Sequence, residues 1–159
     1  MAEHNQLKKI LVVCTGNTCR SPMAEGWLNA HLKESGWIAE SAGVMTGPGG
    51  LPSAEAVQAM AEIKIDISAH RSRPVTRSML NEAAVILTMT EGHWREIIRQ
   101  APEAEEKTFL VHSFGLEELR DVVDPYGLSI EAYRHTRDEL AQALGEFLLH
   151  LAERGELKS

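Results

Sequence analysis

The sequence predicts an α/β fold, a three-layer sandwich in which helices flank a four-stranded parallel sheet on both faces. Short apolar runs rich in β-branched residues alternate along the chain with helical patterns, and crossovers between parallel strands place helices over both faces of a sheet. The second observation is size, because 159 residues with 43% hydrophobic composition suit a single domain, spanning residues 1–159. No repeat, low-complexity tract or linker divides the chain.

The first predicted strand is the apolar run of residues 9–13, which has the β-branched character of a strand buried on both faces. It stops at Cys14, where a polar turn containing glycine begins. Beyond the turn, Ser21 is expected to cap a helix with Pro22 at its first position, and this helix extends to about Lys33. The turn therefore connects a buried strand with the N-terminus of a helix.

The second strand and the second helix are predicted on either side of a glycine-rich loop. Residues 37–41 form a weaker apolar run, the predicted second strand, and the loop follows at residues 43–50. Ser53 can cap a helix over residues 54–60. Residues 66–76 are polar, contain a proline and are expected to form a loop.

The second half of the chain continues the alternation. Residues 83–87 are the best third strand, residues 91–100 suit a helix, and residues 108–111 suit the fourth strand, before a long loop over residues 113–128. The last helix has the clearest pattern, because its apolar side chains recur at three- and four-residue steps, as on a helix that packs along one face. These side chains are Ile130, Tyr133, Leu140, Leu144, Phe147, Leu148 and Leu151.

The charge of the chain argues against broad binding to polyanions. A net charge of −7 does not suit nucleic acid or an anionic membrane, which attract clustered Lys and Arg. Residues 1–9 have no apolar signal-peptide core, and no later run approaches the roughly 18 apolar residues of a membrane span. We therefore expect a soluble, cytoplasmic monomer without nucleic-acid or membrane partners.

The turn after the first strand has the composition of an anion-binding loop. Its residues 14–21, which we call the Cys14 loop, lead into a helix whose first backbone N–H groups are unpaired donors with partial positive charge. A tight loop can turn further N–H groups inward to surround a tetrahedral oxyanion such as inorganic phosphate. The loop consists of Cys14, Thr15, Gly16, Asn17, Thr18, Cys19, Arg20 and Ser21.

Side chains of the Cys14 loop indicate catalysis as well as binding. Arg20 offers a planar fork that can hold two phosphate oxygens, and the positive field favours the thiolate form of Cys14. A thiolate at the floor of the loop could attack phosphorus directly, without a separate base. Ser21 is placed to hydrogen-bond that thiolate when it leaves, and Asn17 suits a left-handed backbone position that closes the loop.

The proton transfers of such a reaction need a further group. The leaving group must be protonated and the attacking water deprotonated, and a single carboxyl can do both. The candidate is Asp124, which precedes Pro125 in the long loop after the fourth strand and could hang over the Cys14 loop. The alternative is that Asp-Pro is an ordinary turn dipeptide.

A Cys followed six positions later by Arg is a weak pattern by itself, because buried cysteines are common. Its position between a strand and a helix favours an enzyme, and a non-catalytic phosphate-binding module for phosphopeptides is the non-enzyme alternative. The sequence indicates no metal and no other cofactor, since Cys14 and Cys19 have no second pair and the seven histidines are scattered.

The sequence resembles the low-molecular-weight protein-tyrosine-phosphatase family along nearly its whole length. The resemblance implies the fold described above, no metal, and hydrolysis of phosphoproteins in two steps, with Cys14 as nucleophile, Arg20 as phosphate clamp and Asp124 as general acid and base. The matching residues are the Cys14 loop with Pro22, Ser41-Ala42-Gly43, His70 with Arg73, and Asp124-Pro125-Tyr126.

The resemblance also implies a support for the Cys14 loop. In the family the loop asparagine, here Asn17, is hydrogen-bonded to a serine and a histidine, for which Ser41 and His70 are the matching positions. A solvated surface histidine is the alternative for His70. The family further implies a reversible disulfide between Cys14 and Cys19, which would shield the nucleophile from irreversible oxidation.

Departures from the tyrosine-specific pattern bear on the substrate. Tyr126 is the one aromatic wall that remains for a phenyl ring, since Gly127 and the glycine-rich loop stand where many members have aromatics. Thr90 replaces an Asp that is common in the family, which removes one charge near the cleft.

Thr18 stands where tyrosine-directed members have a larger aliphatic residue, and Cys-Thr-Gly-Asn-Thr-Cys resembles the bacterial protein-arginine-phosphatase subgroup. A phosphoarginine guanidinium could pair with Asp124, and the Thr18 hydroxyl could offer it a polar contact. The alternative is that Thr18 only points its methyl group into the loop. Phosphoarginine is therefore slightly favoured over phosphotyrosine, and a phosphotyrosine-specific phosphatase is the alternative.

Arsenate reductases of the thiol-relay class share this fold and the first cysteine loop. Their chemistry needs further cysteines to pass a disulfide outward, and residues 76–92 contain none. The sequence therefore disfavours this class.

Overall fold

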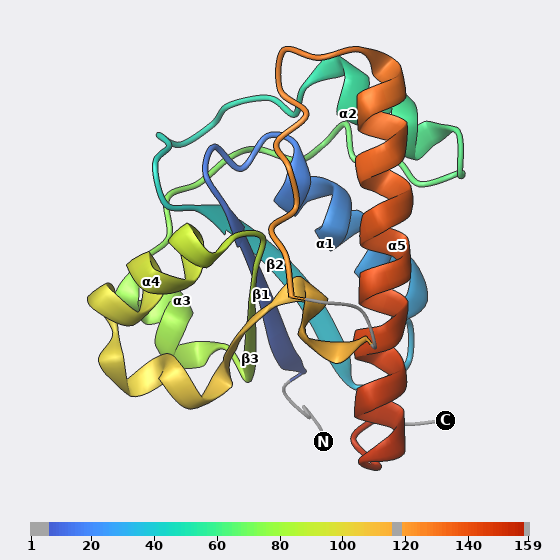
Figure 1. The fold of residues 1–159 in the computed structure, drawn as a ribbon. Helices are drawn as coiled ribbons and strands as arrows, with labels where there is room; N and C mark the ends of the chain where they lie inside the picture. The colour runs from blue at the N-terminus through green and yellow to red at the C-terminus, as the bar shows by residue number, and fades with distance from the viewer. Residues whose placement is uncertain (1–6, 116–118, 158–159) are drawn as a thin grey trace.

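Helices cover both faces of a single sheet in a computed structural model that describes residues 7–115 and 119–157 (Figure 1). The sheet has four parallel strands, as the sequence predicts, and their order is β2-β1-β3-β4. Residues 1–6, 116–118 and 158–159 lie outside the described residues. The prediction for the N-terminal segment, part of the predicted long loop and the two ends of the predicted domain of residues 1–159 fall on them. The strands are β1 (Lys8–Cys14), β2 (Trp37–Gly43), β3 (Val85–Thr88) and β4 (Thr108–Leu110).

The three layers follow from the alternation of side chains along the central strand. Successive residues of a strand point to opposite faces of the sheet. Ile10 and Val12 of β1 therefore join one buried cluster with residues of α1, α2 and α5, while Leu11 and Val13 join the other with residues of α3 and α4. The helices of the described residues are α1 (Arg20–His31), α2 (Ala54–Ala61), α3 (Arg77–Glu82), α4 (Glu91–Gln100) and α5 (Ile130–Glu153), with the 3-10 turns η1 (Pro102–Lys107) and η2 (Val111–Phe114).

The last helix packs as its periodicity predicts. Its N-terminus is capped by Ser129, whose hydroxyl accepts a hydrogen bond from the Ala132 N–H at 3.4 Å. Burial of each large apolar side chain along its inner face contributes about 1.5–3 kcal/mol. The buried side chains include Tyr133, Leu140, Leu144, Phe147 and Leu151.

The start of α1 differs from the prediction. The helix begins at Arg20, its N-cap residue is Cys19, and no side chain caps it. Ser21 is therefore not the N-cap, because its hydroxyl is turned inward to Cys14 and Asn17. The Cys14 loop is thus tighter than predicted, and its arginine already belongs to the helix.

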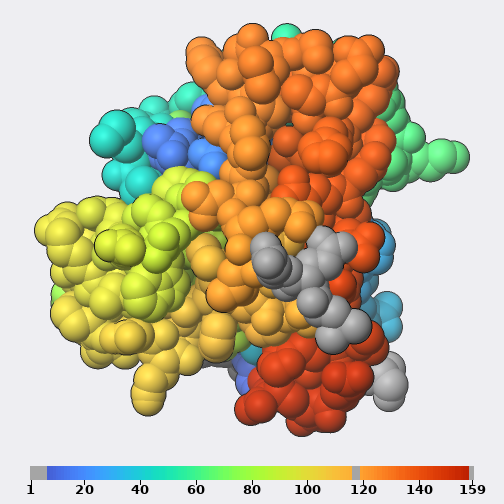
Figure 2. Space-filling model, viewed as in Figure 1, coloured from blue at the N-terminus to red at the C-terminus, as the bar shows by residue number. Residues whose placement is uncertain are grey.

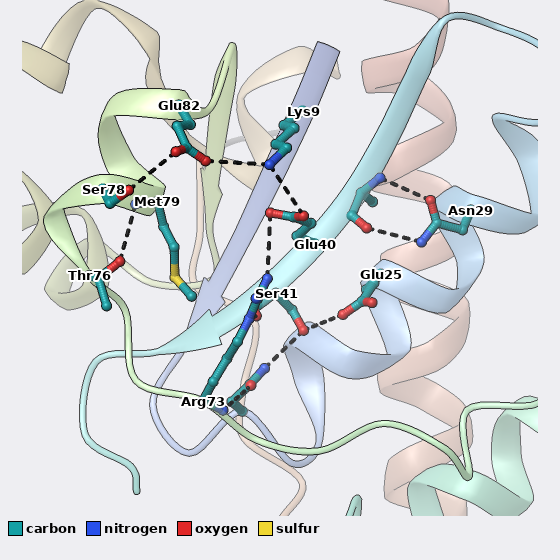
Figure 3. Close-up of polar contacts among 12 residues, drawn as sticks. Lys9, Glu25, Asn29, Glu40, Ser41, Arg73, Thr76, Ser78, Met79 and Glu82 are labelled. Carbon is teal, nitrogen blue, oxygen red and sulfur yellow. Dashed lines mark hydrogen bonds and ion pairs between the residues drawn. The ribbon is translucent and has the colours of Figure 1, made fainter. Parts of the chain in front are cut away.

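Smaller differences concern the strand ends and a short helix. β2 continues two residues past the predicted end, to Gly43, because this residue pairs in register with Cys14 of β1. β4 ends at Leu110, where η2 begins. The six-residue helix α3 was not predicted, since it is too short to show a period; Thr76 caps it by accepting from the Met79 N–H at 3.1 Å (Figure 3).

The carboxyl ends of the parallel strands meet at one edge of the sheet, where open α/β folds bind ligands. Cys14 ends β1 and Thr88 ends β3 at this edge, and the glycine at the end of β2 lies against the Cys14 loop. A Cβ atom at Gly43 would lie 2.6 Å from the Thr15 carbonyl oxygen, so only glycine allows this close approach. No helix of the described residues is long and apolar enough to cross a membrane.

Candidate active site

A pocket of about 460 Å³ opens at the carboxyl edge of the sheet. It brings together the predicted nucleophile, the arginine, the candidate acid and the predicted aromatic wall, which come from β1, α1 and the segment of residues 119–129. In Figure 2 the orange atoms of that segment lie beside blue atoms from the N-terminal part of the chain. The pocket is lined by Cys14, Thr15, Gly16, Thr18, Cys19, Arg20, Leu51, Ser53, Asp124 and Tyr126.

Asn17 closes the Cys14 loop from behind. Its backbone has a φ of 57°, the left-handed conformation expected for it, and its side chain is fully buried. The amide Nδ2 donates to Ser21 Oγ at 2.8 Å and to Ser41 Oγ at 3.0 Å, while Oδ1 accepts from the Arg73 N–H at 3.0 Å. Every hydrogen-bonding site of the amide nitrogen is used, so the turn of the loop is held in one conformation.

His70 and Glu25 extend this support. The backbone carbonyl of Asn17 can only accept, so His70 Nε2 donates its proton to it across 2.8 Å. On the other side of the ring, His70 Nδ1 lies 3.8 Å from Glu25 Oε1. Ser41 Oγ donates to the same Glu25 oxygen (Figure 3). Asn17 therefore donates to Ser41 and accepts from His70, so both partners that the family resemblance implies are hydrogen-bonded to it.

A row of charged side chains extends from Ser41 towards the amino end of β1. Arg73 donates from Nε to the Ser41 carbonyl at 3.1 Å and lies 3.4 Å from Glu40. Lys9 then lies between Glu40 and Glu82, at 3.7 and 3.4 Å (Figure 3). These partly exposed pairs are individually weak, and they align Arg73 with β2.

Cys14 is 2% exposed and contacts one hydroxyl within its own loop. Its Sγ lies 2.9 Å from Ser21 Oγ. Because Ser21 Oγ already accepts a proton from Asn17, its own proton is available to the sulfur. The geometry therefore supplies a hydrogen-bond donor to a thiolate at this position.

Arg20 projects into the pocket with a 5% exposed side chain. Nη1 donates to the Val122 carbonyl at 2.9 Å, and Nη2 donates to Thr15 Oγ1 at 3.4 Å. The buried Nε has no hydrogen-bond partner among the described residues. A buried N–H of a cation without a partner is costly, and an oxyanion in the pocket would satisfy it.

Asp124 lies at the open side of the pocket, with a side chain that is 48% exposed. Its Oδ2 lies 3.5 Å from Arg20 Nη2, and its Oδ1 accepts from the Tyr126 N–H at 3.1 Å. The segment before it is anchored, since the Val122 N–H donates to the Met89 carbonyl at 2.8 Å. Tyr126 stands 71% exposed at the rim.

The second cysteine of the loop lies to one side. Cys19 Sγ contacts Ser53 Oγ at 3.5 Å and the Tyr133 hydroxyl at 3.4 Å, and both cysteines are free thiols. Burial raises the pKa of Tyr133 well above its ordinary value, so this hydroxyl stays protonated. Thr18 lies on the pocket wall, and its carbonyl accepts from the Ser53 N–H at 3.0 Å.

The sequence did not single out three residues that the structure brings to the site. His93 of α4 lies 2.8 Å from Thr15 Oγ1, Leu51 lines the pocket, and Glu25 supports the loop from α1. The position of His93 in a helix that follows the third strand was the available signal, because the carboxyl ends of parallel strands share one edge. Within residues 7–115 and 119–157, no group of three or more His, Cys, Asp or Glu is placed to hold a metal ion.

Comparisons with known proteins agree with this geometry. The family described as low molecular weight phosphotyrosine protein phosphatase matches residues 9–157. A protein-arginine-phosphatase of Bacillus subtilis is 38% identical over 144 residues, which cover 89% of this chain and 95% of that protein.

Two solved structures share the fold over most of this chain. The low molecular weight protein tyrosine phosphatase of T. tengcongensis is 41% identical with a TM-score of 0.86, covering 91% of this chain and 99% of that one. The arginine phosphatase YwlE, solved as a Cys-to-Ser mutant with a phosphorylated active-site serine, is 36% identical with a TM-score of 0.84, covering 91% of this chain and 95% of that one.

Proposed function

Since the chain belongs to the low molecular weight phosphotyrosine protein phosphatase family and is a protein phosphatase, we propose that it works through a phosphocysteine formed at Cys14. The observation that carries the proposal is the contact between Cys14 Sγ and Ser21 Oγ in a pocket that also contains Arg20 and Asp124. The phosphorylated active-site serine of the YwlE mutant supports it, because a serine in place of a cysteine accepted phosphate there.

In the first step the Cys14 thiolate attacks phosphorus. The S–P bond forms while the bond from phosphorus to the substrate oxygen or nitrogen breaks, and the leaving group takes a proton from the Asp124 carboxyl. Arg20 and the loop N–H groups hold the remaining phosphate oxygens, on which charge accumulates. The partnerless Arg20 Nε supports this assignment.

In the second step water attacks the phosphocysteine. The Asp124 carboxylate takes a proton from the water, an O–P bond forms, and the S–P bond breaks to return the thiolate and inorganic phosphate. The Ser21 hydroxyl stabilises the departing thiolate. The half-exposed position of Asp124 supports both roles, because it is open to leaving group and water alike.

Replacement of the nucleophile and of the acid tests the mechanism. Cys14→Ser should lower kcat by more than about 10³-fold, and Asp124→Asn by about 10²- to 10⁴-fold. If the protein were instead a non-catalytic phosphate-binding module, neither Cys14→Ser nor Asp124→Asn would alter the slow background rate of hydrolysis. Isothermal titration with inorganic phosphate should show retained binding by Asp124→Asn, which separates lost chemistry from lost structure.

For the substrate, we propose phosphoarginine slightly ahead of phosphotyrosine. Thr18 lies in the pocket wall, and Tyr126 is the one aromatic among the described residues that line the pocket. Both features support an entrance suited to an aliphatic stem. The name of the Bacillus subtilis relative supports phosphoarginine, and that of the T. tengcongensis structure supports phosphotyrosine, the second candidate.

Rates on a phosphoarginine peptide and a phosphotyrosine peptide would distinguish the two substrates. Thr18→Ile should shift the ratio of kcat/KM towards phosphotyrosine, by about tenfold for one well-placed contact. The matched control is Thr76→Ile, which alters the exposed cap of α3 outside the pocket and should leave the ratio unchanged. An unchanged ratio in Thr18→Ile would contradict the role given to Thr18.

The monomeric state and the cytoplasmic location of the protein stay predictions from the sequence.

A further inference from the structure

His93 occupies the third position of α4, and among the described residues its ring is hydrogen-bonded to the Cys14 loop. The side chain is buried, with 6% exposure, and its Nε2 lies 2.8 Å from the hydroxyl oxygen of Thr15. Neither the family motifs nor the proposed proton transfers use this histidine. A buried polar ring at the back of a catalytic loop requires an explanation.

The Thr15 hydroxyl can connect the arginine with the histidine. Arg20 Nη2 can only donate, so Thr15 Oγ1 accepts from it across 3.4 Å. The hydroxyl keeps its own proton, which it can donate to a lone pair on His93 Nε2, 2.8 Å away. In that arrangement the imidazole is neutral with its proton on Nδ1, an atom that is buried without a partner among the described residues.

The surroundings keep the ring neutral. Burial lowers the pKa of His93 to about 4, with a further lowering by the Arg20 charge and an opposing influence from Asp121 and Asp124. The N-terminus of α4 also disfavours a positive charge in its first turn. At neutral pH one ring nitrogen therefore carries a lone pair that can accept a hydrogen bond.

The guanidinium of Arg20 is thereby held on both of its terminal nitrogens. Nη1 is held by the Val122 carbonyl, and Nη2 by Thr15 with Asp124 Oδ2 3.5 Å away, while Nε is left as a donor for an oxyanion. The Thr15 side chain has three staggered positions, and an acceptor at His93 stabilises the one in which the hydroxyl also contacts the arginine.

We infer that His93 is a positioning residue, which orients the Thr15 hydroxyl and through it sets the Arg20 fork towards bound phosphate. The inference rests on the proposed role of Arg20 as phosphate clamp. Gln at position 93 can place an amide oxygen close to where Nε2 lies, whereas Leu fills similar space without an acceptor. The two substitutions therefore separate hydrogen bonding from packing.

The test compares His93→Leu and His93→Gln in kcat, KM and the inhibition constant of inorganic phosphate. His93→Leu should raise the inhibition constant of inorganic phosphate and lower kcat/KM, each by about tenfold. This is the effect expected when one hydrogen bond to a group that orients a charge is lost. His93→Gln should stay within about threefold of the parent. The matched control is His31→Leu, an exposed histidine at the end of α1, which should change neither value.

Two further measurements distinguish a loss of positioning by His93 from a general folding defect. In a Thr15→Val background, His93→Leu should have no additional effect on phosphate inhibition, because the group that it orients is gone. Nitrogen-15 NMR of the folded parent at pH 7 should show a neutral His93 ring protonated on Nδ1. Equal losses in His93→Gln and His93→Leu, a full additional loss in the Thr15→Val background, or a ring protonated on Nε2 would each overturn the inference.

These measurements do not depend on the phosphocysteine. If Cys14→Ser kept its turnover, the proposed phosphocysteine mechanism would be wrong. The difference in phosphate binding between His93→Gln and His93→Leu would still test the role of His93.

Discussion

Removal of the Ser21 hydroxyl should slow the second half of the reaction more than the first. Ser21 Oγ lies 2.9 Å from Cys14 Sγ and 2.8 Å from the Asn17 Nδ2 that donates to it, so its proton is directed at the sulfur. A hydrogen bond to a charged group is worth about 1.5–3 kcal/mol. At about 1.36 kcal/mol for each factor of ten, Ser21→Ala should slow departure of the thiolate by about 10- to 150-fold.

Rapid mixing with an aryl phosphate measures this effect, because the phenol is released in the first step. In Ser21→Ala the phosphocysteine should accumulate, so a burst of phenol approaching one equivalent of enzyme should precede a slow steady rate. Ser78→Ala, which removes an exposed hydroxyl from α3, is the matched control. A slower steady rate without any burst would refute the reasoning, since it would place the loss in the first step.

The same substitution has a separate effect on stability. It leaves one buried Asn17 N–H without its acceptor, which costs about 1–3 kcal/mol. Urea unfolding of Ser21→Ala measures this cost independently of the kinetics. The two effects together would show that one hydroxyl both closes the loop and serves the sulfur.

Three more predictions concern redox protection, pH and packing. After peroxide treatment and reductant, Cys19→Ser should recover less activity than the parent if a disulfide with Cys14 protects the nucleophile; full recovery would exclude that role. Arg134 hydrogen bonds lower the pKa of Glu62 to about 2 from its ordinary 4.5, so the ion pair contributes fully above about pH 4.5 and its contribution is lost as the pH falls through 2. Glu62→Gln should therefore lower the melting temperature at pH 7 and have a much smaller effect at pH 2; an equal effect at both values would contradict this. Gly43→Ala should destabilise the protein by about 1–3 kcal/mol in urea unfolding, because its Cβ would lie 2.6 Å from a loop carbonyl; an unchanged midpoint would show that the loop yields at no cost.

The sequence determined the parts of this protein that depend on local pattern. The apolar period of α5, the run of β1 and the left-handed Asn17 were all predictable, because strands and helices repeat every two and 3.6 residues and few residues tolerate a positive φ. The contact between Cys14 and Ser21 was predictable too, since both belong to one short loop.

Local signals also misled where a side chain had a stronger partner at a distance. Ser21 has the residue type and spacing of a helix cap, but its hydroxyl is needed inside the loop, so α1 begins two residues earlier than predicted, without a side-chain cap. Helix α3 gave no periodic signal because six residues complete fewer than two turns.

Only the tertiary structure decided how the Cys14 loop is held and aimed. Asn17 reaches Ser41 across 24 residues, and Thr15 reaches His93 across 78, so no pattern within the loop reveals either partner. The parallel sheet brings these residues to one edge, and burial there leaves His93 neutral and Arg20 Nε without a partner. The loop sequence specified a site for phosphate, and the fold supplied the groups that fix its geometry, because hydrogen bonds between distant segments form only when the strands are in register.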